Sequence, residues 1–177
     1  MADFNTFLPT LLKFEGGFVN DPADPGGATN KGITLKTFKA FAQPLLGKSP
    51  TLTNLKALTD KQAGVIYKVE YWDKVQGDDI TSQDLDNILC DFYVNAGANA
   101  TKLFQRVLNK MGADLPITGK IGPQTMAALA KQDQKQVYVK YRQGRIDYYN
   151  NLVKKNPKLK KFLKGWMNRV NAFPDLS

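Results

Sequence analysis

Apolar residues recur three and four positions apart along most of this 177-residue chain. That is the spacing of one face of an α-helix. The first series covers residues 4–12 and a long one covers 138–152, whereas strand signals are few and confined to about 18–35. The hydrophobic fraction of 42% is sufficient for a folded core. We therefore expect a mainly α fold with a small β or loop element near the N-terminus.

A few residues with strong positional preferences mark the helix boundaries. The double glycine at 16–17 should end the first helix. The run TDKQ at 59–62 has the pattern of a capping box, and Pro123 suits the first position of a helix. The helix indicated by TLKTFKAFAQPLLG should be broken near Pro44, because proline lacks the backbone N–H that a helix interior needs.

The chain contains no histidine and one cysteine, Cys90. Ser-His-Asp and Cys-His catalysis and the usual zinc hydrolase sites with histidine ligands are thereby excluded. Cys90 lies in an apolar helical pattern, which favours a buried structural thiol. Acid–base chemistry should therefore use carboxylates, and we expect no metal or organic cofactor.

Charge is distributed unevenly between the two parts of the chain. Residues 1–100 hold 9 Lys and Arg against 12 Asp and Glu, and residues 101–177 hold 16 against 4. A basic half attracts an anionic partner, for which nucleic acid, an anionic membrane surface and a bacterial cell wall all qualify, and a solvated face kept for solubility is the alternative. There is no recognised nucleic-acid motif, no apolar run of membrane-spanning length and no secretory signal at the N-terminus.

Glu15 is the more unusual of the two glutamates, the other being Glu70. It continues the apolar series of the first helix, so it should lie on the core-facing stripe at the C-terminal end of that helix. Partial burial and the helix dipole both favour the protonated carboxylic acid there, as a general acid requires. In the alternative, the helix ends at Phe14 and the side chain points into water.

The turn-rich segment after Glu15 offers a second carboxylate. Asp21 and Asp24 precede prolines, and Gly26-Gly27 permits positive φ, so this loop could fold an aspartate back toward Glu15. A pair of carboxylates that flanks a sugar bond is the usual machinery of glycoside hydrolysis. The alternative is an Asx-turn loop or a calcium loop, although the EF-hand pattern is absent.

The contiguous stretch EGGFVNDPADPGGATNKGIT resembles the N-terminal signature of glycoside hydrolase family 108. Members are bacterial and phage N-acetylmuramidases that cut peptidoglycan, and some are known as secretion activator proteins. The resemblance implies a lysozyme-like α+β fold with Glu15 as the catalytic residue. Phage lysozymes have eight residues between Glu and Asp and five between Asp and Thr. Here eight residues separate Glu15 from Asp24, but only four separate Asp24 from Thr29. This difference leaves the role of Thr29 as the water-orienting residue undecided, and Asp21 is an alternative to Asp24 as the second carboxylate.

Later blocks extend the resemblance over most of the chain. YWDKV, DFYVNAG and LPITGKIGPQTMAAL are similar to family blocks, as are GRIDYYNNL and FLKGWMNRV, although Thr118 replaces an aspartate of the family pattern. The resemblance implies a substrate-binding set of Asp21, Asn30, Gly32, Tyr71, Trp72, Asp91 and Asn95. In the alternative, the two aromatics belong to the core, as do Tyr148, Tyr149 and Trp166, and Asp91 and Asn95 form a buried hydrogen bond to the N-terminal loop.

The resemblance therefore implies a monomeric muramidase that cleaves the β-1,4 bond between N-acetylmuramic acid and N-acetylglucosamine. Glu15 would protonate the glycosidic oxygen, Asp24 or Asp21 would stabilise the transition state, and Thr29 and Asn30 would orient water. We expect a catalytic segment at 1–95 and a helical peptidoglycan-binding segment at 96–177, packed as one compact unit.

The basic half would hold the enzyme near anionic wall polymers. We expect synthesis in a bacterial or phage-infected cytoplasm and action on the wall, in the periplasm or outside the cell. The alternatives are a lytic transglycosylase, an inactive peptidoglycan-binding or secretion-accessory protein, and a nucleic-acid-binding protein. Retention or inversion of the anomeric configuration stays open, because it depends on the separation of the carboxylates.

Overall fold

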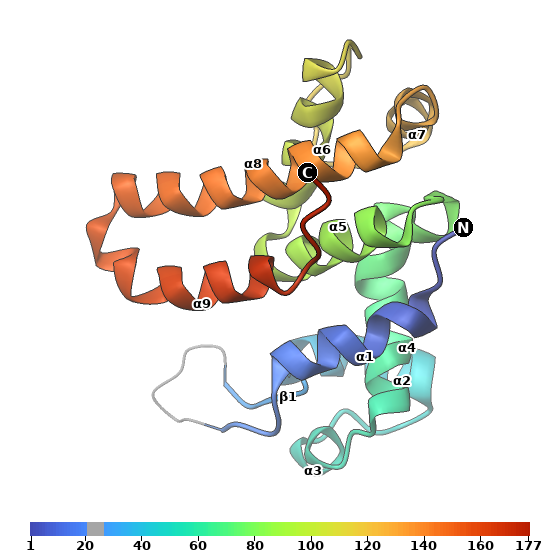
Figure 1. The fold of residues 1–177 in the computed structure, drawn as a ribbon. Coiled ribbons are helices and arrows are strands. Elements are labelled where there is room, and N and C mark those ends of the chain that lie inside the picture. The colour runs from blue at the N-terminus through green and yellow to red at the C-terminus, as the bar shows by residue number, and fades with distance from the viewer. Residues whose placement is uncertain (21–26) are drawn as a thin grey trace. The chain divides into compact units, whose positions relative to one another are not determined.

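The fold is mainly α with a two-stranded sheet near the N-terminus, as the sequence predicts (Figure 1). It is taken from a computed structural model, which describes residues 1–20 and 27–177. The elements are α1 Phe4–Glu15, β1 Thr29–Asn30, β2 Ile33–Thr34, α2 Leu35–Leu46, α3 Leu52–Lys56, α4 Asp60–Tyr67, a π-helical turn Lys68–Trp72, 3-10 turns Asp73–Val75 and Gly77–Asp79, α5 Gln83–Ala96, α6 Ala98–Lys110, α7 Pro123–Ala130, α8 Gln134–Lys155, a 3-10 turn Pro157–Leu159 and α9 Lys160–Asn171.

The chain forms two compact units. The N-terminal unit is Phe4–Glu70, and the C-terminal unit consists of Met1–Asp3 with Tyr71–Ser177. The boundary falls within the π-helical turn Lys68–Trp72. The division into functional segments at residues 95 and 96 stays a prediction.

In the N-terminal unit, α1 is amphipathic and ends where the sequence predicts. Phe4, Phe7 and Leu11 form its buried stripe. Gly16 follows with a φ of 68°, which ends the helix because glycine adopts this left-handed conformation without steric cost. Glu15 is therefore the last helical residue, in agreement with the predicted boundary.

The β element is a short hairpin between α1 and α2. Thr29 pairs with Thr34 and Asn30 with Ile33, and an isolated bridge joins Val19 to Thr29. Both residues of the turn, Lys31 and Gly32, have positive φ, at 51° and 75°. Two successive positive φ values are typical of the type I′ turn that suits the twist of a hairpin.

Helix α2 differs from the sequence prediction. It continues through Pro44 to Leu46 and ends at Gly47, which has a φ of 61° and donates its N–H to the Gln43 carbonyl. The predicted break near Pro44 is wrong, because the helix continues for two residues beyond the proline, whose missing N–H removes only one intrahelical bond. The predicted capping box is confirmed at α4, where Thr59 and Gln62 exchange bonds of 3.1 and 3.2 Å.

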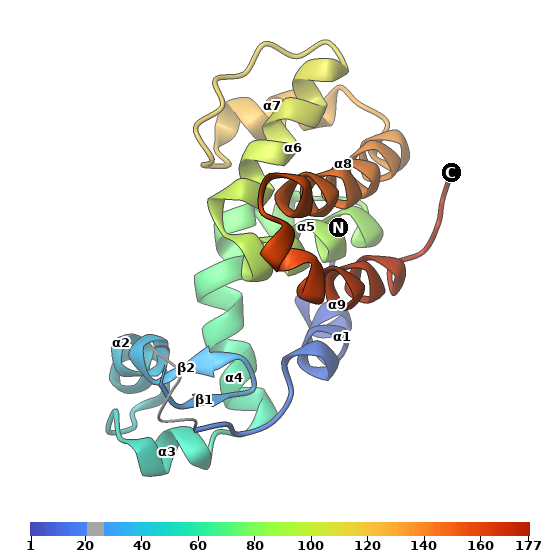
Figure 2. The ribbon, with the colours of Figure 1, turned by 90° about the vertical axis from the view of Figure 1, so that its left-hand side faces the viewer.

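The C-terminal unit is built on α5, α6 and α8, which contact one another, while α9 packs along α8 as an antiparallel hairpin (Figures 1 and 2). Its core is aromatic, with Phe92, Phe104, Tyr141 and Tyr149 in edge-to-face contacts. Pro123 occupies the first turn of α7, as predicted.

The single cysteine is structural in its placement. Cys90 is buried in α5, as the sequence predicts. Burial, together with the charges of Asp86 and Asp91, raises the pKa of its thiol well above the ordinary value. A thiol held in the protonated form is a weak nucleophile. Within residues 1–20 and 27–177, no helix is both long and apolar enough to cross a membrane.

Candidate active site

Glu15 lies half-buried at the C-terminal end of α1. The exposed Gly16 follows directly, so the helix ends at the carboxyl-bearing residue. The placement on the edge of the buried stripe agrees with the predicted continuation of the apolar series.

The Glu15 carboxylate lies directly against Gly32 of the hairpin turn. A Cβ atom added to Gly32 would lie 2.5 Å from Oε2 of Glu15 and still nearer to the hydroxyl oxygen of Tyr67. Both oxygens are thus within 2.5 Å of one point, so they are at most about 5 Å apart. The missing side chain of Gly32 makes room for a carboxyl group and a hydroxyl group that come from two different helices.

Tyr67 fixes the turn beneath Glu15. Its ring is buried at the end of α4, and its hydroxyl donates a 2.9 Å hydrogen bond to the carbonyl oxygen of Lys31. On the other side of the turn, the Lys31 ammonium forms a 2.6 Å ion pair with Asp60. These two bonds stabilise Lys31 in its left-handed conformation, which is uncommon for a residue with a side chain.

Thr29 and Asn30 hold the hairpin in place. The backbone N–H and carbonyl of Thr29 each form a 2.8 Å bond with Val19. The buried Asn30 amide donates to the carbonyls of Leu55 and Lys56, at 2.9 and 3.1 Å, at the end of α3. Because a side-chain amide has two N–H donors, both are engaged in these bonds. Asn30 therefore positions the strand that leads into the turn.

The surface next to this site is hollowed. A pocket of about 450 Å³ is bordered by Gly16 and Lys31, the chain neighbours of Glu15 and Gly32, and by the apolar side chains Leu8 and Leu12. The predicted partner carboxylates, Asp21 and Asp24, lie outside the described residues. In the N-terminal unit, the structure brings Glu15, Gly32 and Tyr67 together, with Thr29 and Asn30 in the strand behind the turn.

The other predicted site residues belong to the C-terminal unit. Trp72 is fully buried, and its indole N–H donates a 2.8 Å bond to Asp78. Tyr71 keeps part of its surface exposed and packs edge-on against Tyr93, with ring centroids 6.2 Å apart. Trp72 has no exposed surface to offer a glycan, whereas Tyr71 does.

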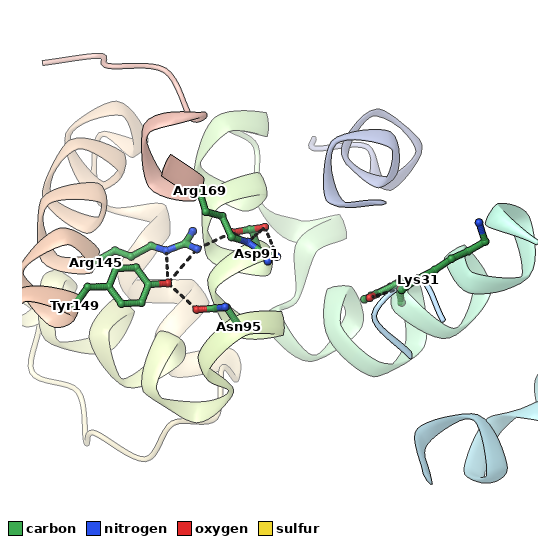
Figure 3. Close-up of polar contacts among 7 residues, drawn as sticks. Lys31, Asp91, Asn95, Arg145, Tyr149 and Arg169 are labelled. Carbon is green, nitrogen blue, oxygen red and sulfur yellow. Dashed lines mark hydrogen bonds and ion pairs between the residues drawn. The ribbon is translucent and has the colours of Figure 1, made fainter. Parts of the chain in front are cut away.

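Asp91 is the centre of a buried ionic network. Its side chain has no exposed surface, and Arg145 and Arg169 reach it at 2.7 and 2.9 Å (Figure 3). Asn95, one turn later, accepts a 2.6 Å hydrogen bond from the hydroxyl of Tyr149. The network joins α5 to α8 and α9, so both polar residues contribute to the packing of this unit.

Sequence reasoning missed Tyr67 as a site residue. It has the helical spacing of Ala63 and Ile66, and an aromatic residue in such a series is indistinguishable from ordinary core. The one available signal was chemical, because a tyrosine that is buried at the end of a helix needs a partner for its hydroxyl. The structure identifies this partner as the turn that carries Gly32.

Comparisons with known proteins give two family matches and a similar solved structure. Residues 8–97 match the family described as glycosyl hydrolase 108, and residues 99–171 match a family described as a predicted peptidoglycan domain. Among solved structures, SagA from Brucella abortus is similar, with 34% sequence identity and a TM-score of 0.75 over 96% of this chain and 90% of the SagA chain. No curated protein matches the chain.

Proposed function

Because the chain belongs to the glycosyl hydrolase 108 family, we propose that it hydrolyses the β-1,4 bond between N-acetylmuramic acid and N-acetylglucosamine in peptidoglycan. The family and the predicted peptidoglycan domain support a peptidoglycan hydrolase in general. The identity of the bond and the residues that cleave it are the proposal. It rests on the residues around Glu15.

Glu15 is the proposed general acid that protonates the leaving glycosidic oxygen. The observation that carries this role is the position of its carboxyl group, half-buried at a helix C-terminus against Gly32 and within about 5 Å of the Tyr67 hydroxyl. A hollow in the surface is bordered by Gly16 and Lys31, the chain neighbours of Glu15 and Gly32.

A second group must stabilise the developing positive charge or activate water. Asp24 is the proposed partner, with Asp21 as the alternative, because both belong to the family-like segment after Glu15. Thr29 is the proposed water-orienting residue. Asn30 has a different role in the proposal, because both of its donors already bind the end of α3.

The wall is also the proposed place of action. Residues 101–177 carry 16 Lys and Arg against 4 Asp and Glu, so the field of this half attracts the enzyme to anionic wall polymers. Tyr71, which keeps exposed surface, is the proposed aromatic contact for the glycan. No step of the proposed reaction uses a metal or an organic cofactor.

Digestion of purified peptidoglycan, followed by mass spectrometry of the fragments, tests the reaction class. We expect reducing N-acetylmuramic acid ends from the wild type. Anhydro ends would instead identify a lytic transglycosylase, and reducing N-acetylglucosamine ends would identify cleavage of the other glycosidic bond. Binding to peptidoglycan without any new ends would identify an inactive binding protein.

A further inference from the structure

The hairpin of α8 and α9 carries an unusual concentration of positive charge. Residues 148–174 contain six lysines and Arg169 and no Asp or Glu. Arg169 is engaged with Asp91. The six lysines are all exposed and surround the 3-10 turn Pro157–Leu159 that joins the two helices: Lys154, Lys155, Lys158, Lys160, Lys161 and Lys164. We call residues 154–164 the basic tip.

An aromatic series leads from the core of this unit to the basic tip. Tyr149 is buried and stacks on Trp166, with ring centroids 5.0 Å apart and planes at 17°. Trp166 in turn contacts Phe162 at 5.8 Å, and Phe162 is 47% exposed. The Lys161 ammonium lies 4.9 Å from the Phe162 ring centroid. A large apolar ring is thus presented to solvent among six cations.

Hydrogen bonds to α5 hold the helices that carry the Phe162 ring. Tyr149 bonds to Asn95 of α5, and Arg169 of α9 bonds to Asp91 of the same helix. Helix α9 is therefore tied to α5 through Arg169, and the series that ends at Phe162 starts from a buried, hydrogen-bonded residue. Phe162 therefore packs on Trp166 with one side of its ring and leaves the rest of the ring exposed to solvent.

Three kinds of partner differ in the groups that they offer to the lysines and to Phe162. A neutral glycan offers nothing for six cations to pair with. A soluble or wall-bound polyanion offers charge but no apolar phase for Phe162. The interface of an anionic bilayer offers both, because lysines pair with headgroup phosphates while an aromatic ring enters the boundary with the acyl chains.

We propose that the basic tip docks on the surface of an anionic phospholipid bilayer, with Phe162 inserted at the interface. Docking uses residues that take no part in the proposed hydrolysis, so it is independent of that proposal. Each lysine near such a surface contributes about a fivefold increase in binding. The Phe162 ring adds a contribution that a simple polyanion would not provide.

Co-sedimentation of the full chain with lipid vesicles tests the docking. We expect binding to vesicles of phosphatidylcholine mixed with phosphatidylglycerol and no binding to phosphatidylcholine alone. Lys158→Glu with Lys161→Glu should weaken binding about 30-fold or more. The matched control is Lys135→Glu with Lys140→Glu, which changes net charge equally at exposed sites on α8. These sites lie about 20 Å or more along the helix from Lys155.

The variant Phe162→Ala distinguishes docking on a lipid surface from binding to a polyanion. It should weaken vesicle binding about fivefold to tenfold, whereas Ile117→Ala, which removes another exposed apolar side chain of the same unit, should not. Far-ultraviolet circular dichroism and melting temperature establish that each variant is folded. Equal losses from the two charge-reversed pairs would overturn the proposal, as would unchanged vesicle binding by Phe162→Ala. If Lys158→Glu with Lys161→Glu lost binding to peptidoglycan sacculi but kept binding to vesicles, the basic tip would be a site for a wall polyanion and the proposal would be overturned.

Discussion

At the scale of single residues, the site depends on a glycine. Gly32 was predicted to bind substrate because of its place in a family-like motif, and the structure adds a physical reason for glycine there. The residue has a φ of 75°, and the carboxyl group of Glu15 and the hydroxyl of Tyr67 fill the space that a side chain would occupy. Glu15 could be predicted from the apolar series that it ends, whereas Tyr67 could not, because its partner is distant in sequence.

Replacing Gly32 with alanine should disturb this arrangement. The added Cβ would lie within 2.5 Å of both oxygens, and displacement of a reacting group by about 1 Å can cost about 100-fold in rate. We expect a loss of activity of that order and a loss of about 2 kcal/mol or more of stability. The measurements are the rate of peptidoglycan cleavage and the free energy of unfolding.

Gly47→Ala is the matched control for Gly32→Ala. Gly47 also has positive φ, at 61°, but no atom lies near its added Cβ. It should therefore cost about 1 kcal/mol of stability and leave activity unchanged. If the two variants had equal activity, the crowding of Glu15 would not be the cause.

Removing only the hydroxyl of Tyr67 tests its positioning role. Tyr67→Phe keeps the buried ring but deletes the 2.9 Å bond to the Lys31 carbonyl, so it should cost about 1 kcal/mol. We also expect about a tenfold lower turnover rate with little change in KM, because the turn against Glu15 loses its tether. Steady-state kinetics on soluble glycan fragments measures both.

A tyrosine in the other unit provides the comparison for Tyr67. Tyr138 donates a 2.6 Å bond to the Pro174 carbonyl, so Tyr138→Phe should cost similar stability without loss of turnover. A fall in turnover for both variants would attribute the effect to general destabilisation.

At the scale of elements, helix positions followed from apolar spacing and capping residues, since these signals are local. The break at Pro44 was predicted wrongly because one missing backbone bond does not end a helix that packs on a neighbouring element, here α4, and the local pattern does not give that packing. The role of Asp91 was equally hidden. A polar residue on an apolar stripe is compatible with a cleft wall or a buried ion pair, and the arginines that decide between them are 54 and 78 residues away.

Breaking the Asp91 network should destabilise the C-terminal unit. Asp91→Asn leaves the fully buried Arg145 without its anionic partner, and loss of one member of a buried pair costs about 3 kcal/mol or more. Chemical denaturation measures the change. Asp147→Asn, at an exposed position on α8 where Asp147 accepts a bond from Gln143, should change stability by less than about 0.5 kcal/mol. Equal effects would contradict a structural role that is particular to Asp91.

At the scale of the whole molecule, the family resemblance is confirmed, and it covers nearly the entire chain in the comparison with SagA. The family segments meet between residues 97 and 99, whereas the compact units divide after Glu70. The boundary between family segments can be located from sequence motifs. The boundary between compact units depends on contacts among residues that are distant in sequence, so the sequence could not predict a division at Glu70. The residues proposed for catalysis that the structure describes all belong to the N-terminal unit.

The central claim is that Glu15 donates the proton that cleaves the glycan. Its most direct test compares the cleavage rate of peptidoglycan by the wild type, Glu15→Gln and Glu70→Gln, since Glu70 is the other glutamate of the chain. Loss of a general acid costs about 100-fold or more. We predict at least this loss for Glu15→Gln and a near-wild-type rate for Glu70→Gln, with all three proteins equally folded. A Glu15→Gln variant that cleaves at the wild-type rate would contradict the account.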